Sequence, residues 1–107
     1  MVKIPLPDDL KHFIAERGLF EGFMRDGSPG YVELWAIENI SKLNAEIEID
    51  TFAPGFLAFA GNGGDEVLAF DATGVVFMIP LIGMEPTSAI KVAASFAEFA
   101  ETFELDD

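Results

Sequence analysis

Apolar residues recur at helical spacing in three segments of the chain. The first lies between Asp8, a good N-cap residue, and Gly18, which can supply a left-handed C-terminal turn. The second predicts a helix over residues 38–47, and the third begins at Ser95, which forms a capping-box pattern with Glu98. The apolar stripe of this third helix comprises Phe96, Phe99, Ala100 and Phe103. We therefore expect an N-terminal, a middle and a C-terminal helix.

Short apolar runs rich in Val, Ile and aromatic residues predict strands between these helices. The expected strands cover residues 19–25, 31–37, 56–60, 66–71 and 75–80. Gly, Pro, Asn and Asp gather between them, and the connections after the second helix are too short for crossover helices. The sequence thus predicts an α+β fold, a single domain over residues 1–107, with an antiparallel β-meander sheet of about five strands.

The expected strands do not alternate apolar and polar residues, as strands with one wet face do. Neighbouring positions such as Val67 and Leu68, or Phe77 and Met78, are both apolar although they point to opposite faces. Both faces of the sheet are therefore expected to be apolar. Either the helices cover both faces, or part of one is left for a partner or for a homodimer.

Charge limits the classes of partner. The chain has 107 residues, half of them hydrophobic, with 19 acids against 6 bases and a formal net charge of -13. Such apolar content excludes a disordered chain, and the acidity argues against nucleic acid and anionic membranes. A basic protein would be attracted.

The absence of cysteine excludes a disulfide scaffold and a thiolate nucleophile, and it favours a reducing compartment. Residues 1–7 lack the apolar core of a signal peptide, and the longest uncharged stretches, 51–64 and 72–84, contain Pro and Gly. We expect a soluble, cytoplasmic protein.

Few residues could perform catalysis. The one histidine, His12, is expected opposite the apolar stripe of the first helix, and one His without Cys makes a zinc or iron site improbable. The glycine-rich segment 61–65 is followed by a strand rather than by the helix that a phosphate loop requires, and Asp65 and Glu66 would repel an anion. We expect no catalytic residue, no cofactor and no metal ion, and hence no enzyme.

Two places suggest binding. Trp35 and Tyr31, the only Trp and Tyr, share one strand face with Glu33 between them, so Trp35 is either a core residue or an amphipathic ring at the edge of a groove. The acids after the middle helix are either a solvated helix end or a contact patch. The candidate contact residues are Trp35, Asn62, Asp65 and Glu66, with Glu46, Glu48 and Asp50 as a second patch.

An ordered series of short motifs over residues 6–103 resembles the SUKH superfamily. The motifs are Leu6-Pro7, Trp35-Ala-Ile37, Asn44, Pro54-Gly55, Gly61-Asn-Gly-Gly-Asp-Glu66, Phe70-Asp71, Val76, Pro80, Ile82-Gly-Met84 and Ser95-Phe-Ala-Glu-Phe99. The resemblance implies an α+β fold with a β-meander and a terminal helix. It also implies a non-enzymatic role, most often as an immunity protein that neutralises a polymorphic bacterial toxin, frequently a nuclease, whereas fungal relatives regulate cell-wall synthesis.

Together these features predict a protein-binding domain that occludes a basic toxin domain. The alternative is a ligand- or peptide-binding regulatory module without a toxin partner.

Overall fold

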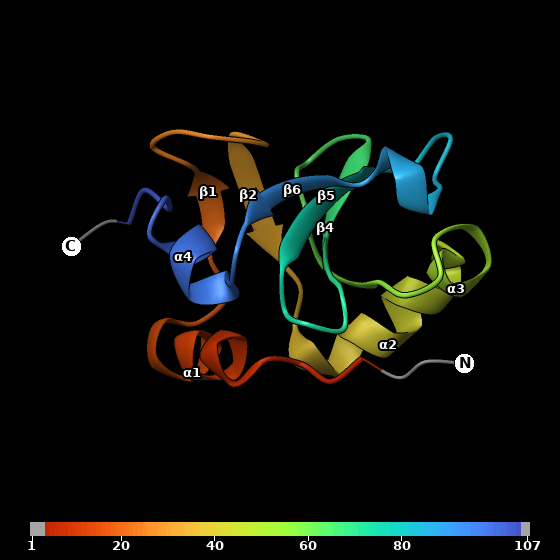
Figure 1. The fold of residues 1–107 in the computed structure, drawn as a ribbon. Coiled ribbons are helices and arrows are strands. Elements are labelled where there is room, and N and C mark those ends of the chain that lie inside the picture. The colour runs from red at the N-terminus through yellow and green to blue at the C-terminus, as the bar shows by residue number, and fades with distance from the viewer. Residues whose placement is uncertain (1–3, 106–107) are drawn as a thin grey trace.

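A six-stranded antiparallel sheet, with its strands in chain order from β1 to β6, forms the centre of the molecule. A computed structural model describes residues 4–105 (Figure 1). The elements are α1 (Asp8–Arg17), β1 (Glu21–Phe23), β2 (Tyr31–Leu34), α2 (Ile37–Glu46), α3 (Ile49–Phe52), β3 (Leu57–Gly61), β4 (Glu66–Phe70), β5 (Val76–Pro80), the short 3₁₀ helix η1 (Pro86–Ser88), β6 (Ile90–Ala93) and α4 (Phe96–Ala100). The predicted α+β meander is confirmed, with six strands instead of about five.

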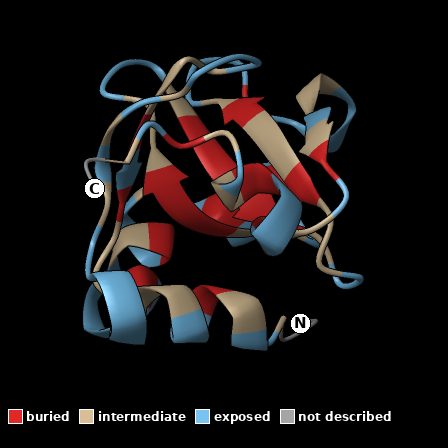
Figure 2. Ribbon diagram, turned by 90° about the vertical axis from the view of Figure 1, so that its left-hand side faces the viewer, coloured by how far each residue is buried: buried red, intermediate tan, exposed pale blue. Residues whose placement is uncertain are grey.

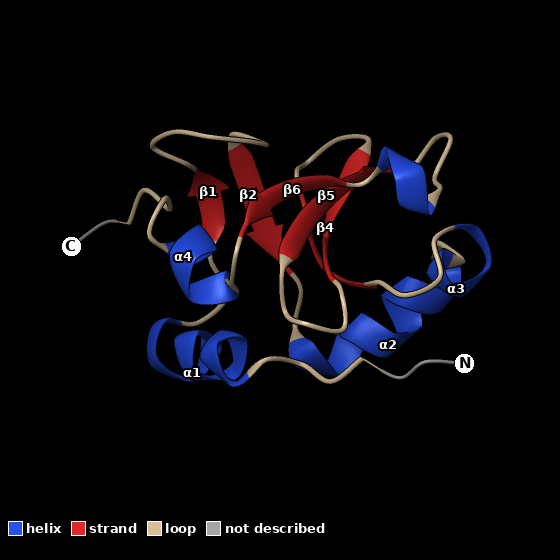
Figure 3. Ribbon diagram, in the orientation of Figure 1, coloured by secondary structure: helices blue, strands red, loops and turns tan. Residues whose placement is uncertain are grey.

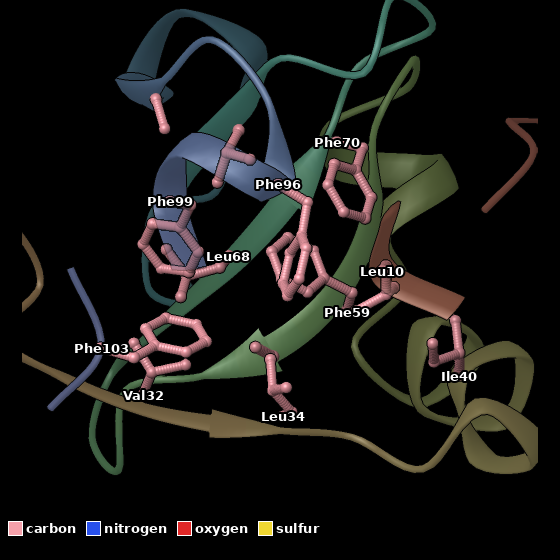
Figure 4. Packing of buried hydrophobic residues seen from close by; sticks show 13 residues of the cluster. Leu10, Val32, Leu34, Ile40, Phe59, Leu68, Phe70, Phe96, Phe99 and Phe103 are labelled. Atoms are coloured by element: carbon pink, nitrogen blue, oxygen red, sulfur yellow. The ribbon is translucent and has the colours of Figure 1, made fainter. Parts of the chain in front are cut away.

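The helices lie along the curled sheet, with α1 and α2 beneath it and α4 against α1 in the view of Figure 3. One face of the sheet holds the first core cluster, in which Phe59 stacks on Phe70 at 4.1 Å between ring centroids. The aromatic stripe of α4 and the turn after it enters this cluster (Figure 4). Figure 2 shows the buried positions on the strands and on the inner sides of the helices.

The opposite face holds a second core cluster. Val67 and Ala69 belong to it, while Leu68 and Phe70, which alternate with them on β4, belong to the first. Ile49 and Ala53, from α3 and the residue after it, cover this second face. The expectation that both faces are apolar is therefore confirmed.

The junction of α1 and α4 corrects one expectation. The residue before the first helical turn is Pro7, whose ring makes no capping hydrogen bond to α1, and Asp8 is already helical. Asp9 instead accepts hydrogen bonds from the N–H of Leu10 at 2.9 Å and from the N–H of Ala97 at 3.0 Å. A carboxylate at the start of both helices also suits their macrodipoles. The two helices, 88 positions apart in sequence, are thus joined by one side chain.

The other two caps that the sequence predicts, Gly18 and Ser95, are confirmed. Gly18 has φ 80° and its N–H donates to Ile14, closing α1, and the Ser95 hydroxyl accepts from the N–H of Glu98 at 3.1 Å, starting α4. These bonds satisfy backbone groups that a helix end otherwise leaves without partners.

Asn44 joins α2 to β3 and is buried. Its Oδ1 accepts from the Ala58 N–H at 2.8 Å, and its Nδ2 donates to the carbonyls of Ala58 at 2.8 Å and of Ile40 at 2.7 Å. A side-chain amide has the same donor and acceptor as a peptide group, so Asn44 supplies the pair of bonds that an adjacent strand would give.

Three elements were not predicted from the sequence, and one of them is the short 3₁₀ helix η1. Helix α3 begins after Glu48, which adopts a left-handed conformation at φ 55° and redirects the chain. Strand β6 adds the sixth strand beside β5, with Ile90 and Lys91 exposed.

Candidate protein-binding surface

The outer side of the hairpin formed by β1 and β2 is the exposed continuation of the second core face. Glu21 lies directly opposite Glu33, and Phe23 opposite Tyr31, so these four side chains share one face. Val32 and Leu34 point to the other side, into the first core cluster. We call the surface of Glu21, Phe23, Tyr31, Glu33 and Trp35 the hairpin face.

One row of paired residues crosses the sheet and shows where its cover ends. Glu33 pairs with Gly61, Gly61 with Val67, and Val67 with Ile79. Val67 and Ile79 are buried under the second cluster, whereas Glu33 is exposed. The same sheet face therefore changes from apolar and covered to acidic and exposed at Gly61.

The aromatic residues of the hairpin face lie partly in the open. Phe23 is 65% exposed, and its ring meets that of Tyr31 edge-to-face at 5.3 Å. A methyl group added to Gly63 would lie 3.3 Å from the Tyr31 ring, and one added to Gly61 would lie 3.7 Å from Trp35 Nε1. Gly63 thus allows the β3–β4 turn to approach the Tyr31 ring closely, while Gly61 places no side chain beside Trp35.

Carboxylates govern the electrostatics of the hairpin face. The Tyr31 hydroxyl donates a 2.6 Å hydrogen bond to Glu21 Oε2. This bond, then the partial desolvation of the phenol and the charges of Glu21 and Glu33, raise the pKa of Tyr31 above its ordinary value. Glu21 and Glu33 are like charges directly opposite each other, an arrangement that destabilises a strand pair. A cation placed between Glu21 and Glu33 would relieve this repulsion.

Trp35 is half-buried and packs against both core clusters, so it is partly a core residue and partly surface. Its backbone N–H donates to the Phe59 carbonyl at 3.0 Å. The core interpretation therefore describes part of the Trp35 side chain, and its position at the edge of a groove stays a prediction.

The other predicted contact residues, Asn62, Asp65 and Glu66, belong to the β3–β4 turn and the first residue of β4. Asn62 Oδ1 accepts from the N–H groups of Gly64 at 2.9 Å and Glu66 at 3.2 Å, and its Nδ2 donates to Glu66 Oε1 at 3.0 Å. Asn62 therefore shapes the turn, while Asp65 is exposed.

The second predicted patch is elsewhere. Glu46, Glu48 and Asp50 are exposed where α2 meets α3, next to the beginning of β3, while the turn of Asn62 follows its end. Asp50 borders an open hollow of about 530 Å³, lined mainly by apolar residues of α2, α3 and their surroundings. The seven candidate residues thus form two separate surfaces.

His12 lies on the exposed side of α1, as the sequence predicts, with its Nε2 3.1 Å from a carboxylate oxygen of Glu16. Across the described part of the chain, no three His, Cys, Asp or Glu side chains gather in a way that could hold a metal ion. Within residues 4–105, no helix has the length and apolar content to cross a lipid bilayer.

Sequence reasoning missed Glu21 and Phe23 as members of this surface. The alternation of Tyr31, Glu33 and Trp35 marks the face of β2, but the pairing partners on β1 depend on the hairpin register. That register is fixed by the long connection between the strands, whose conformation the residues alone do not specify.

The family model described as SMI1 / KNR4 family (SUKH-1) matches residues 1–102. Among curated proteins, none matches the chain.

Proposed function

Because the chain belongs to the SMI1 / KNR4 family (SUKH-1), we propose that it is a non-enzymatic immunity protein that binds a basic bacterial toxin domain and occludes its active site. A nuclease is an apt target, since its active-site surface must be cationic to hold phosphates. The protein would act in the cytoplasm, where a toxin of this kind meets nucleic acid.

The hairpin face carries this proposal. It presents aromatic rings between carboxylates on a sheet face whose remainder lies under the second core cluster. Aromatic residues supply much of the desolvated contact in protein interfaces, and charges of opposite sign orient the partners. Asp65, exposed in the adjoining turn, adds a further negative charge, while Glu66 alternates with Val67 on β4 and so belongs to the opposite face of the sheet.

The overall charge of -13 supports the association step. A net field of this sign attracts a cationic domain over about one Debye length, roughly 8–10 Å at physiological salt. Under this proposal the second patch of Glu46, Glu48 and Asp50 adds to the attraction without entering the contact.

The test begins with the genes that flank the gene of this protein: the proposal predicts that one of them encodes a toxin domain, and that domain is the partner to assay. We expect equimolar protein to abolish the toxin's activity, and the association rate constant to fall by about tenfold or more when NaCl rises from about 50 to about 500 mM. A toxin that keeps its activity at saturating protein contradicts the proposed function. Inhibition with a salt-independent association rate contradicts the electrostatic part alone.

The alternative is a regulatory module that binds a ligand or peptide, and the apolar hollow beside α2 and α3 favours it. This alternative predicts no inhibition of the neighbouring toxin domain. It also predicts that native mass spectrometry of the protein purified from its host detects a bound molecule.

A further inference from the structure

The exposed aromatic pair of the hairpin face suits a planar cation. Phe23 is two-thirds exposed and lies edge-to-face with Tyr31, so apolar ring surface remains available to a partner. A cation over an aromatic ring is attracted by the negative charge of the ring face, and Arg makes such contacts more often than Lys. The guanidinium group is planar and weakly hydrated, so it stacks on rings at low desolvation cost.

The carboxylates next to the rings define the charge of the occupant. Glu21 and Glu33 face each other across β1 and β2, and the Tyr31 hydroxyl holds Glu21 beside the ring by a 2.6 Å bond. Gly61, which pairs with Glu33 on its other side, has no side chain to cover that carboxylate. Carboxylates bind guanidinium groups through two parallel hydrogen bonds, which an ammonium cannot form.

Other occupants fit less well. A second copy of the chain would bring its own Glu21 and Glu33 against the same carboxylates, and a phosphate-bearing ligand would be repelled by both. An arginine of a basic partner supplies both the planar surface and the positive charge.

We infer that the hairpin face is an arginine-binding site, in which a guanidinium from the partner lies against Phe23 and Tyr31 and is bound by Glu21 and Glu33. This inference rests on the proposed function, because it names the chemistry by which a basic toxin domain is recognised.

The first experiment uses a small probe instead of the toxin. Titrating the ¹⁵N-labelled full chain with N-acetyl-arginine amide should give saturable shifts in residues 21–24 and 31–35 and at the Trp35 indole N–H. N-acetyl-citrulline amide, which has the same shape without the charge, should give no saturable shift, and N-acetyl-lysine amide should bind about threefold or more weakly. Equal shifts with citrulline or with lysine would overturn the assignment to arginine.

Variants identify the site. F23A should weaken arginine amide binding about three- to fivefold, and E21Q/E33Q should abolish saturation. The matched control is E46Q/E48Q, which removes two exposed charges at the α2–α3 corner and should bind like the wild type. Arginine shifts that persist in E21Q/E33Q, or that disappear in E46Q/E48Q, would overturn the site.

Stability separates a binding role from a structural one. Because E33Q removes a like-charge contact, its unfolding midpoint should equal or exceed that of the wild type while its arginine binding falls. A loss of stability in parallel with binding would contradict the inference.

Different results would contradict the arginine site and the proposed immunity function. If the toxin domain is inhibited but arginine amide does not bind the hairpin face, the inference fails and the proposed function stands. If arginine amide binds there and the toxin domain is not inhibited, the proposed function fails and the site stands.

Discussion

The substitution of Asn44 by Ala tests how α2 is held on the sheet. The carboxamide bonds both the N–H and the carbonyl of Ala58 at 2.8 Å, in a place where β2 no longer runs beside β3. Asn44→Ala removes the carboxamide that pairs with both the N–H and the carbonyl of Ala58, and it inserts no group that could replace the carboxamide. The Ile40 carbonyl lies inside α2 and keeps its helical partner, so its loss of the Nδ2 bond matters less.

The expected magnitude follows from the two backbone groups of Ala58. A buried polar group left without a partner costs about 1–3 kcal/mol, so the loss of partners for two groups in Asn44→Ala should lower the free energy of unfolding by about 2–6 kcal/mol. The total free energy of unfolding of a protein of this size is about 5–15 kcal/mol. At about 4–8 °C per kcal/mol, the midpoint of thermal unfolding should fall by about 8 °C or more.

Fluorescence of Trp35, the only tryptophan, reports unfolding because the indole packs against both core clusters. The matched control is Asn39→Ala, an exposed position on the same helix, which should change stability by about 0.5 kcal/mol or less. If Asn44→Ala and Asn39→Ala unfold at the same denaturant concentration, the bonds to Ala58 do not stabilise the fold as argued.

Three further predictions concern single side chains. Ser95→Ala removes the cap of α4 and should cost about 0.5–2 kcal/mol in urea unfolding, and an unchanged midpoint would contradict the capping bond. Burial would raise the pKa of Asp71, but hydrogen bonds from Thr73 and the turn backbone hold this pKa below its ordinary value. The ionised Asp71 therefore stabilises the fold above about pH 4, and this stabilisation is lost as the pH falls through the lower folded-state pKa. D71N should therefore be less stable than the wild type near neutral pH, and the difference in unfolding free energy between the two proteins should shrink at about pH 2. A difference that does not vary with pH would contradict this assignment. The pKa of Tyr31, the only tyrosine, should lie above its ordinary value of about 10 in an absorbance titration and should fall toward it in E21Q, whereas equal values in both proteins would exclude the bond to Glu21.

The elements that the sequence predicts are those whose pattern is local. The capping box at Ser95 and the apolar stripe after it specify α4, and the short turn before Glu66 specifies the pairing of β3 with β4. Helix α3 is not predictable from the sequence because the left-handed conformation that separates α3 from α2 is adopted by Glu48 and not by a glycine. Packing of Ile49 and Ala53 on the sheet, which local sequence does not reveal, helps to stabilise that bend.

The candidate site is predictable to the same extent. Trp35 and the turn of Asn62 carry local signals, and Gly61 and Gly63, which flank Asn62, approach Trp35 and Tyr31 respectively. Glu21 and Phe23 join them through a strand register set by residues 24–30, a connection longer than the two-residue turns whose geometry follows from sequence. β6 was missed for a related reason: its four residues are paired by β5, and half of them are exposed.

The central claim is that this protein works by holding a basic partner on the hairpin face. Its most direct test is the dissociation constant for the neighbouring toxin domain, measured for the F23A/E21Q/E33Q variant and for the E46Q/E48Q/D50N control, each of which removes charge from one surface only. We predict at least about tenfold weaker binding for the first and a change of about twofold or less for the second. Tight binding by the hairpin variant, with loss of binding in the control, would contradict the account.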